Sequence, residues 1–218
     1  MSMSVTQIIS QIYPVQDTIL QTWYDNFNKE LIAAGKSPVS YDGLMKITQV
    51  VGDMLHTYFL NCAMGIPNIT LPEKLKALEQ PIKDAVKIYE VEWLLHEFTI
   101  RKNDEYEGHP DLLAMMTWEG KRIKALVDAK SYGVYRYYFW LPLLKEWSTE
   151  KKLNGNTKKV ALQTSLYRDA LMFSPEDHVK RHWNVSHSFC FHLLPDKVDV
   201  VPLKYDVQPY LEWLKNNS

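Results

Sequence analysis

The stretch "GHPDLLAMMTWEGKRIKALVDAK", from Gly108 to Lys130, contains two apolar, strand-like segments separated by Glu119-Gly120. This pattern predicts a β-hairpin with a two-residue turn, although Glu-Gly is a weaker turn signal than Asn-Gly. In that register Asp111 lies directly opposite Asp128, with the two Cβ atoms about 5 Å apart on one face. Lys130 follows Asp128 by two residues, so its side chain shares that face. A three- or five-residue loop would instead move one carboxylate to the other face.

Two carboxylates placed directly opposite each other repel, so this hairpin requires a cation between them. Lys130 can supply part of the positive charge, and two close carboxylates also suit a hard cation such as Mg²⁺. The alternative is an ordinary surface hairpin with two solvated aspartates, because so short a motif also occurs by chance.

Other polar residues are candidates for the same site, and each also has a purely structural interpretation. Gly52 and His56 are four residues apart on one face of an expected helix, where a histidine can simply border an apolar stripe. Glu92 belongs to an expected strand beside the hairpin and can equally be a solvated strand residue. Gln163 and Tyr167 share a helix face, a spacing that is also common on half-buried helices.

The composition of the chain limits its class. Of the 218 residues, 46% are hydrophobic, which is enough for a substantial core and argues against disorder. The net charge of -1 and the pI of about 6.7 argue mildly against a protein that coats DNA, because such domains exceed pI ~9. The longest apolar run, "YYFWLPLL", is far shorter than the ~20 residues that span a bilayer and is interrupted by Pro142. We therefore expect no membrane partner.

The N-terminus and the cysteines favour a cytoplasmic protein. "MSMSVTQIIS" lacks the basic and long apolar regions of a secretory signal, so we expect none here. Cys62 and Cys190 are the two cysteines of the chain, too few for a disulfide framework or a four-thiolate iron–sulfur cluster.

Periodicity and turn residues predict an α/β protein without repeats or long linkers. We expect helices at 5–33, 40–62, 71–86, 131–147 (broken near Pro142), 160–173 and 207–217. We expect β-structure at 87–100, in the central hairpin, and in a late hairpin at 186–206 that turns at Pro195-Asp196. Residues 101–110 and 148–159 are expected to be loops.

Five short motifs follow one another in a distinctive order. They are "GDMLH" ending at His56, "VEW" with Glu92, "GHPD" ending at Asp111, "DAK" from Asp128 to Lys130, and "QTSLY" from Gln163 to Tyr167. In this order the chain resembles the PD-(D/E)XK nuclease superfamily over about residues 50–170, and its RecB-type branch in particular. That branch includes the RecB nuclease domain, the CRISPR-associated RecB-like nucleases and the mitochondrial genome-maintenance exonuclease.

The resemblance implies a fold and an activity. The fold is a restriction-endonuclease-like α/β core with a central mixed β-sheet flanked by helices. It would form one domain over 1–218, with a helical N-terminal part at about 1–85 and a catalytic core at about 86–205. The activity is that of a Mg²⁺- or Mn²⁺-dependent deoxyribonuclease, an exonuclease of the RecB type that hydrolyses phosphodiester bonds in DNA.

The resemblance also implies roles for the individual residues. The metal ligands would be the side chains of His56, Asp111 and Asp128 and the main-chain carbonyl of Ala129. Lys130 would orient the attacking water or stabilise developing charge, and Glu92 would hold a second metal or a metal-bound water. Gln163 and Tyr167 would position the water or the phosphate backbone. Lys130→Ala is then expected to abolish cleavage while leaving folding and metal binding nearly intact.

The chain departs from the family pattern in two respects. The segment between Lys130 and Gln163 is long and aromatic, and its tyrosines either stack on unpaired bases or pack in the core. Several relatives carry four cysteines for an iron–sulfur cluster, and this chain cannot form one.

Four lysines near the last motif either follow a nucleic-acid strand or belong to a solvated loop, namely Lys151, Lys152, Lys158 and Lys159.

Two other interpretations remain open. One is a catalytically inactive nuclease-fold protein that binds nucleic acid or a protein partner. The other is an unrelated α/β protein whose motifs match by chance. The intact set of Asp111, Asp128 and Lys130 favours an active enzyme over an inactive relative.

Overall fold

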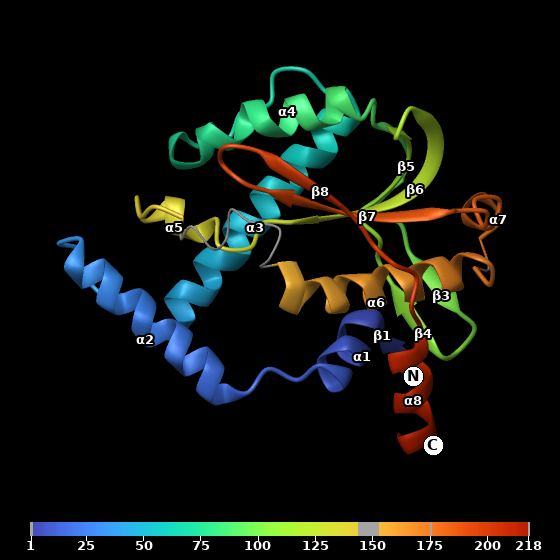
Figure 1. The fold of residues 1–218 in the computed structure, drawn as a ribbon, viewed down its shortest axis with the longest axis horizontal. Coiled ribbons are helices and arrows are strands. Elements are labelled where there is room, and N and C mark those ends of the chain that lie inside the picture. The colour runs from blue at the N-terminus through green and yellow to red at the C-terminus, as the bar shows by residue number, and fades with distance from the viewer. Residues whose placement is uncertain (1, 144–152, 175, 218) are drawn as a thin grey trace.

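The structure, a computed structural model that describes residues 2–143, 153–174 and 176–217, contains two β-sheets flanked by helices (Figure 1). The larger sheet has five strands in the order β2-β5-β6-β7-β8, and the smaller has three in the order β1-β4-β3. The strands of the larger sheet are β2 (Glu92–His96), β5 (Leu112–Trp118), β6 (Lys121–Lys130), β7 (His187–Leu193) and β8 (Val198–Pro202). The predicted α/β fold with a mixed sheet flanked by helices is thus confirmed.

The central hairpin has the predicted register. Trp118 pairs with Lys121 and Leu112 pairs with Val127 across β5 and β6. Glu119 and Gly120 both have positive φ, at 49° and 73°, as a two-residue type I′ turn requires. The backbone twist of this turn matches the twist of the strands, so the register follows directly from the turn.

Alternate residues of the hairpin enter two separate cores. Leu112, Ala114 and Val127 belong to the core beneath α3 (Tyr41–Ala63) and α4 (Glu79–Ile88). The residues between them, Leu113 and Leu126, pack with α1 (Val5–Ile12) and α6 (Leu153–Leu171). The second half of β6 is therefore covered on both faces, and a charged side chain there loses most of its water.

Strands β6 and β7 are parallel, with α6 in the connection between them. Lys130 lies opposite His192 in this pair, so the C-terminal ends of both strands reach the same edge of the sheet. Strand β7 then turns into β8 as an antiparallel hairpin closed by a Leu194–Lys197 hydrogen bond of 2.9 Å. The predicted late hairpin around Pro195-Asp196 is confirmed.

The N-terminal part is helical, as expected, but the long helix predicted over 5–33 is two helices. The first is α1, and the second is α2 (Asp17–Ala33). Pro14 lies between them, and proline lacks the backbone N–H that a continuous helix requires.

Several boundaries differ from the prediction for local reasons. The helix predicted over 71–86 is a 3₁₀ helix, η1 (Glu73–Leu78), followed by α4, and Pro81 lies in the first turn of α4, where its missing N–H costs nothing. The loop predicted over 148–159 is helical from Leu153 onward. In the helix predicted over 131–147, the described part is helical at α5 (Tyr135–Tyr138), and 144–152 lie outside the described residues.

The smaller sheet was not expected. It is formed by β1 (Met3–Ser4), β3 (Ile100–Lys102) and β4 (Tyr106–Gly108), and β1 is parallel to β4. Its two later strands form a local antiparallel hairpin at the end of the predicted β-structure and in the predicted loop. Each spans only three residues, Ile100–Lys102 and Tyr106–Gly108, which is too short to show a periodic pattern. The remaining helices are α7 (Asp177–Lys180) and α8 (Gln208–Asn217). No helix in the described ranges has the length and apolar character needed to span a membrane.

Candidate active site

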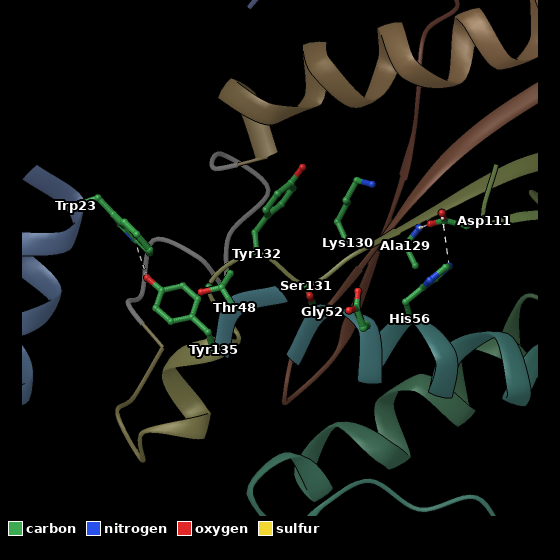
Figure 2. A pocket seen from close by; sticks show the side chains of 12 residues that line it. Trp23, Thr48, Gly52, His56, Asp111, Ala129, Lys130, Ser131, Tyr132 and Tyr135 are labelled. Carbon is green, nitrogen blue, oxygen red and sulfur yellow. Dashed lines mark hydrogen bonds and ion pairs between the residues drawn. The ribbon is translucent and has the colours of Figure 1, made fainter. Parts of the chain in front are cut away.

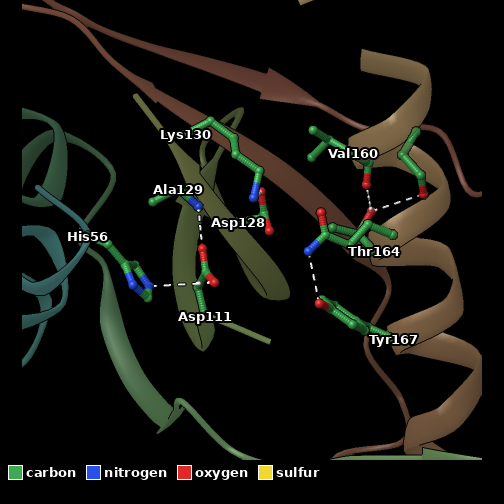
Figure 3. Close-up of polar contacts among 10 residues, drawn as sticks. His56, Asp111, Asp128, Ala129, Lys130, Val160, Thr164 and Tyr167 are labelled. Atoms are coloured by element: carbon green, nitrogen blue, oxygen red, sulfur yellow. Dashed lines mark hydrogen bonds and ion pairs between the residues drawn. The ribbon is translucent and has the colours of Figure 1, made fainter. Parts of the chain in front are cut away.

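Asp111 and Asp128, the two acidic residues of the predicted hairpin, meet at the C-terminal end of β6 (Figure 3). Asp111 directly precedes β5, and its Oδ2 accepts a hydrogen bond of 2.8 Å from the Ala129 N–H. Because β5 begins only at Leu112, the Asp111 side chain takes the bond that another strand residue would have made. The N–H and carbonyl of a strand residue point to the same edge, so the Ala129 carbonyl also faces this side.

Asp128 is buried beside Lys130 on the face of β6 that looks toward α6. Lys130 Nζ lies 2.7 Å from Asp128 Oδ2, and Asp128 is only 1% exposed. Apart from this ion pair, neither carboxylate oxygen has a hydrogen-bond partner among the described residues. Burial raises the pKa of Asp128 to about 7, although the Lys130 ammonium lowers it. The nearby charge of Asp111 adds to the increase.

Lys130 stays charged despite its position. Burial lowers the pKa of Lys130, but Asp128 and Asp111 outweigh that effect and raise it overall. The site therefore contains a fixed cation paired with Asp128, with the charge of Asp111 nearby.

His56 points from α3 toward the carboxylates, in the expected orientation. Its Nε2 lies 3.5 Å from Asp111 Oδ1, and its Nδ1 lies 4.0 Å from Glu97 Oε1. Within the described ranges Nε2 is buried without a hydrogen-bond partner. Gly52, one turn before His56, is not needed to leave space, because a Cβ there would lie 3.7 Å from Ser131 Oγ, an ordinary contact.

Gln163 and Tyr167 face the same group from α6. Gln163 Nε2 donates a hydrogen bond of 2.9 Å to the Tyr167 hydroxyl. Burial raises the pKa of Tyr167 to about 12, and the charges of Asp128, Asp111 and Lys130 also act on it. The phenol is therefore neutral at physiological pH and retains a proton that it can donate.

The structure does not bring Glu92 to the site, which corrects the sequence-based assignment. The Glu92 carboxylate is largely exposed and pairs with Arg122 at 2.7 Å, in the half of the hairpin nearer its turn. Glu97 from the same segment lies beside His56 instead. The β2–β5 register shifts between Trp93 and Leu95, and Glu97 has a positive φ of 45°. Strand alternation alone does not reveal such a shift.

The structure adds two residues to the site for which the sequence analysis proposed no role. A Cβ at Gly108 would lie 2.4 Å from Tyr167 Cε1, so the ring of Tyr167 packs directly on this glycine. Trp23 of α2 lines the same pocket as His56, Asp111 and Lys130. The "GHPD" motif was a signal for Gly108, whereas no sequence signal links Trp23 to the site.

The pocket beside these residues has a volume of about 430 Å³ (Figure 2). His56, Asp111 and Lys130 lie at one end of it, and Trp23 and Tyr135 lie at the other. The pocket thus joins the polar group at the edge of the sheet to an aromatic wall built from α2 and α5.

The described residues contain no group of three His, Cys, Asp or Glu side chains arranged to hold one metal ion. Mg²⁺, however, is commonly bound by one or two carboxylates together with water and substrate phosphate. Asp128 Oδ1 is buried without a partner in the described ranges, Oδ2 has only the ion pair with Lys130, and His56 Nε2 is buried without a hydrogen bond. These unsatisfied acceptors fit a divalent cation held by Asp111 and Asp128, with His56 and the Ala129 carbonyl as further ligands.

The described lysines predicted to follow a strand do not line this pocket, whereas Tyr132 and Tyr135 of the aromatic segment do. Lys158 belongs to α6 and lines a separate pocket with Tyr13 and Lys204. Lys151 and Lys152 lie outside the described residues. Tyr135 is 5% exposed and packs mainly with the α2 core, as the core-packing interpretation predicted.

Comparison with known proteins adds no family to this geometry. A scan against models of protein families gives no match, and a search of curated proteins finds no significant similarity.

Proposed function

We propose that this protein is a Mg²⁺- or Mn²⁺-dependent nuclease that hydrolyses phosphodiester bonds in DNA. One observation carries the proposal: the hairpin register joins Asp111 to Ala129 and sets the buried Asp128–Lys130 pair beside it. His56, Asp111 and Lys130 line one pocket, and Asp128 is buried directly beside Lys130. Such a set of carboxylates, cation and histidine supports metal-dependent hydrolysis of a phosphodiester. The family resemblance of the five motifs supports the same activity, and an exonuclease of the RecB type in particular.

The residues would divide the work between charge and position. Lys130 would donate to an oxygen of the scissile phosphate and stabilise the negative charge that develops there. Gln163 and Tyr167 would orient the attacking water or the strand from the α6 side. Asp111 and Asp128, with His56 and the Ala129 carbonyl, would hold the divalent ion. When bound, such an ion lowers the pKa of a water molecule and neutralises charge on the phosphate.

A second candidate is an inactive nuclease-fold protein that binds nucleic acid or a protein partner. It is favoured by the direct Asp128–Lys130 contact and by the absence of a three-residue metal group in the described ranges. The two candidates differ in one outcome, which is whether DNA is cut in the presence of a metal.

The test is cleavage of end-labelled single- and double-stranded DNA, with free or blocked ends, in Mg²⁺, Mn²⁺ or EDTA. We expect cleavage with either metal and none in EDTA. Asp111→Asn and Lys130→Gln should each lower the rate on the order of 10²-fold, because each removes a charge at the reacting phosphate.

Glu92→Gln is the matched control for Glu97→Gln, because it makes the same substitution at a glutamate that pairs with Arg122 outside the site. It should retain wild-type activity, whereas Glu97→Gln should lower it. Full activity in both Asp111→Asn and Lys130→Gln would mean that other residues carry out the hydrolysis. A wild-type protein that cuts no DNA, with either metal, would favour the second candidate.

A further inference from the structure

The far end of the pocket is aromatic and uncharged. Trp23, Thr48 and Tyr135 line this end, and none of them carries a formal charge. The polar end carries Lys130 and Asp111 (Figure 2). A ligand that fills both ends therefore combines a flat apolar part with a charged part.

Trp23 is held as a rigid platform. Its indole N–H donates a hydrogen bond of 2.8 Å to the Tyr135 hydroxyl. The two rings also pack edge to face, with centroids 5.6 Å apart and planes at 75°. Tyr135 is itself fixed by edge-to-face packing on Phe27 of α2. Because the Trp23 ring is ordered before anything binds, stacking on it costs little side-chain entropy.

The volume of the pocket suits one nucleotide. At about 430 Å³ it lies in the lower part of the ~300–1,000 Å³ range of small-ligand pockets. A base within an intact duplex is paired and stacked on both sides, so it cannot enter a pocket of this kind unless it leaves the helix. An unpaired base has a free face for an aromatic side chain.

We infer that this pocket takes the base of one unpaired nucleotide, stacked on Trp23, next to the phosphodiester held at Lys130. The inference rests on the proposed function and adds to it a base-stacking subsite supplied by Trp23 of α2. The N-terminal helix α2 then supplies substrate selection, while the sheet edge supplies the chemistry.

The experiment measures strand binding and does not depend on cleavage. The probes are short single strands with phosphorothioate linkages that carry 2-aminopurine at one position, scanned from the end inward. Stacking on an indole quenches this base, so we expect quenching at one position near the cleaved end. Trp23→Ala should abolish the quenching and raise Kd on the order of 10-fold, the typical contribution of one stacked base.

Two matched variants separate stacking from structure. Trp23→Phe keeps a ring and should retain most of the affinity. Trp183→Ala removes an exposed tryptophan that lines a different pocket and should change nothing. Melting curves verify that each variant is folded. Blunt duplexes of the same sequence should bind more weakly, and Trp23→Ala should not alter that binding.

The outcomes distinguish this inference from the proposed function. Trp23-dependent strand binding without any cleavage would support the pocket and overturn the nuclease. Metal-dependent cleavage with unchanged strand binding in Trp23→Ala would overturn the pocket and leave the nuclease standing. Equal Trp23 dependence for strands and blunt duplexes, or no strand binding at all, would also overturn the inference.

Discussion

Asp128 and Lys130 connect the stability of β6 to the proposed chemistry, because Asp128 is buried and has Lys130 as its ion-pair partner. The sequence alone suggested that Lys130→Ala would leave folding nearly intact. The structure changes that expectation, since removal of the lysine leaves a buried carboxylate without a partner.

We predict that Lys130→Ala lowers the free energy of unfolding by about 3 kcal/mol. The double variant Asp128→Asn/Lys130→Met should recover most of this loss, because it removes both charges and retains similar volume. Urea unfolding at pH 7.5 measures the difference, with Lys158→Ala as an exposed control. Exposed ion pairs contribute at most about 1 kcal/mol. A loss below that value in Lys130→Ala would show that Asp128 tolerates the removal of its ion-pair partner.

The contact between Gly108 and Tyr167 gives a second test at the residue scale. A Cβ at Gly108 would lie 2.4 Å from the Tyr167 ring, so Gly108→Ala must displace that ring and its hydrogen bond to Gln163. We predict a loss of about 1–3 kcal/mol, the usual cost of overpacking, and reduced DNA cleavage.

A double-mutant cycle isolates this contact. In a Tyr167→Ala background the added methyl group of Gly108→Ala no longer meets a ring, so most of its cost should disappear. Melting curves and cleavage rates on the four proteins provide the measurement. An undiminished cost in the Tyr167→Ala background would mean that the glycine is needed to leave space for Val5, whose Cγ2 would lie 3.1 Å from the added Cβ.

At the scale of elements, the Glu119-Gly120 turn sets the register of the central hairpin. Both residues have positive φ, and glutamate adopts that conformation at a cost of about 1 kcal/mol. Glu119→Asn should therefore raise the free energy of unfolding by about 0.5–1 kcal/mol. Gly120→Ala should lower it by about 1 kcal/mol for backbone reasons alone, because a Cβ there meets nothing within 4 Å.

Thermal unfolding measures both turn variants, with the exposed Glu73→Asn as a control for the amide substitution. Neither turn variant should change the cleavage rate, since the turn lies at the opposite end of β6 from Asp128. A stabilised Glu119→Asn protein with reduced cleavage would indicate that the register itself had moved.

At the scale of the whole molecule, His192 gives the stability a dependence on pH. It is 3% exposed, and burial lowers its pKa below the ordinary value of about 6.5. The unfolded chain therefore binds a proton that the folded protein does not, so stability falls as pH drops below about 6.5. We predict that, between pH 7.5 and 5.5, the free energy of unfolding of His192→Gln falls by about 1 kcal/mol less than that of the wild type.

Urea unfolding at the two pH values tests this prediction. His109→Gln, an exposed substitution of the same kind, is the control and should behave like the wild type. An identical pH dependence in the His192 and wild-type proteins would assign the acid sensitivity to other groups.

The sequence by itself determined the features that depend on neighbouring residues. The Glu-Gly turn and strand alternation were sufficient for the register of β5 and β6, and hence for the meeting of Asp111, Asp128 and Lys130. Helical spacing was sufficient to place His56 on one helix and Gln163 with Tyr167 on another. Each of these features arises within one or two adjacent elements, whose geometry follows from backbone periodicity.

Only the tertiary structure decided which distant side chains complete the site. Glu92 pairs with Met115, some distance along β5 from Asp111, whereas Glu97 follows the end of β2 and lies beside His56. The packing of α2 on Tyr135 brings Trp23 to the pocket. The parallel pairing of β6 with β7 and of β1 with β4 likewise joins segments far apart in the chain. Such contacts depend on the packing of whole elements against one another, and packing surfaces are shared by many sequences that have the same local periodicity.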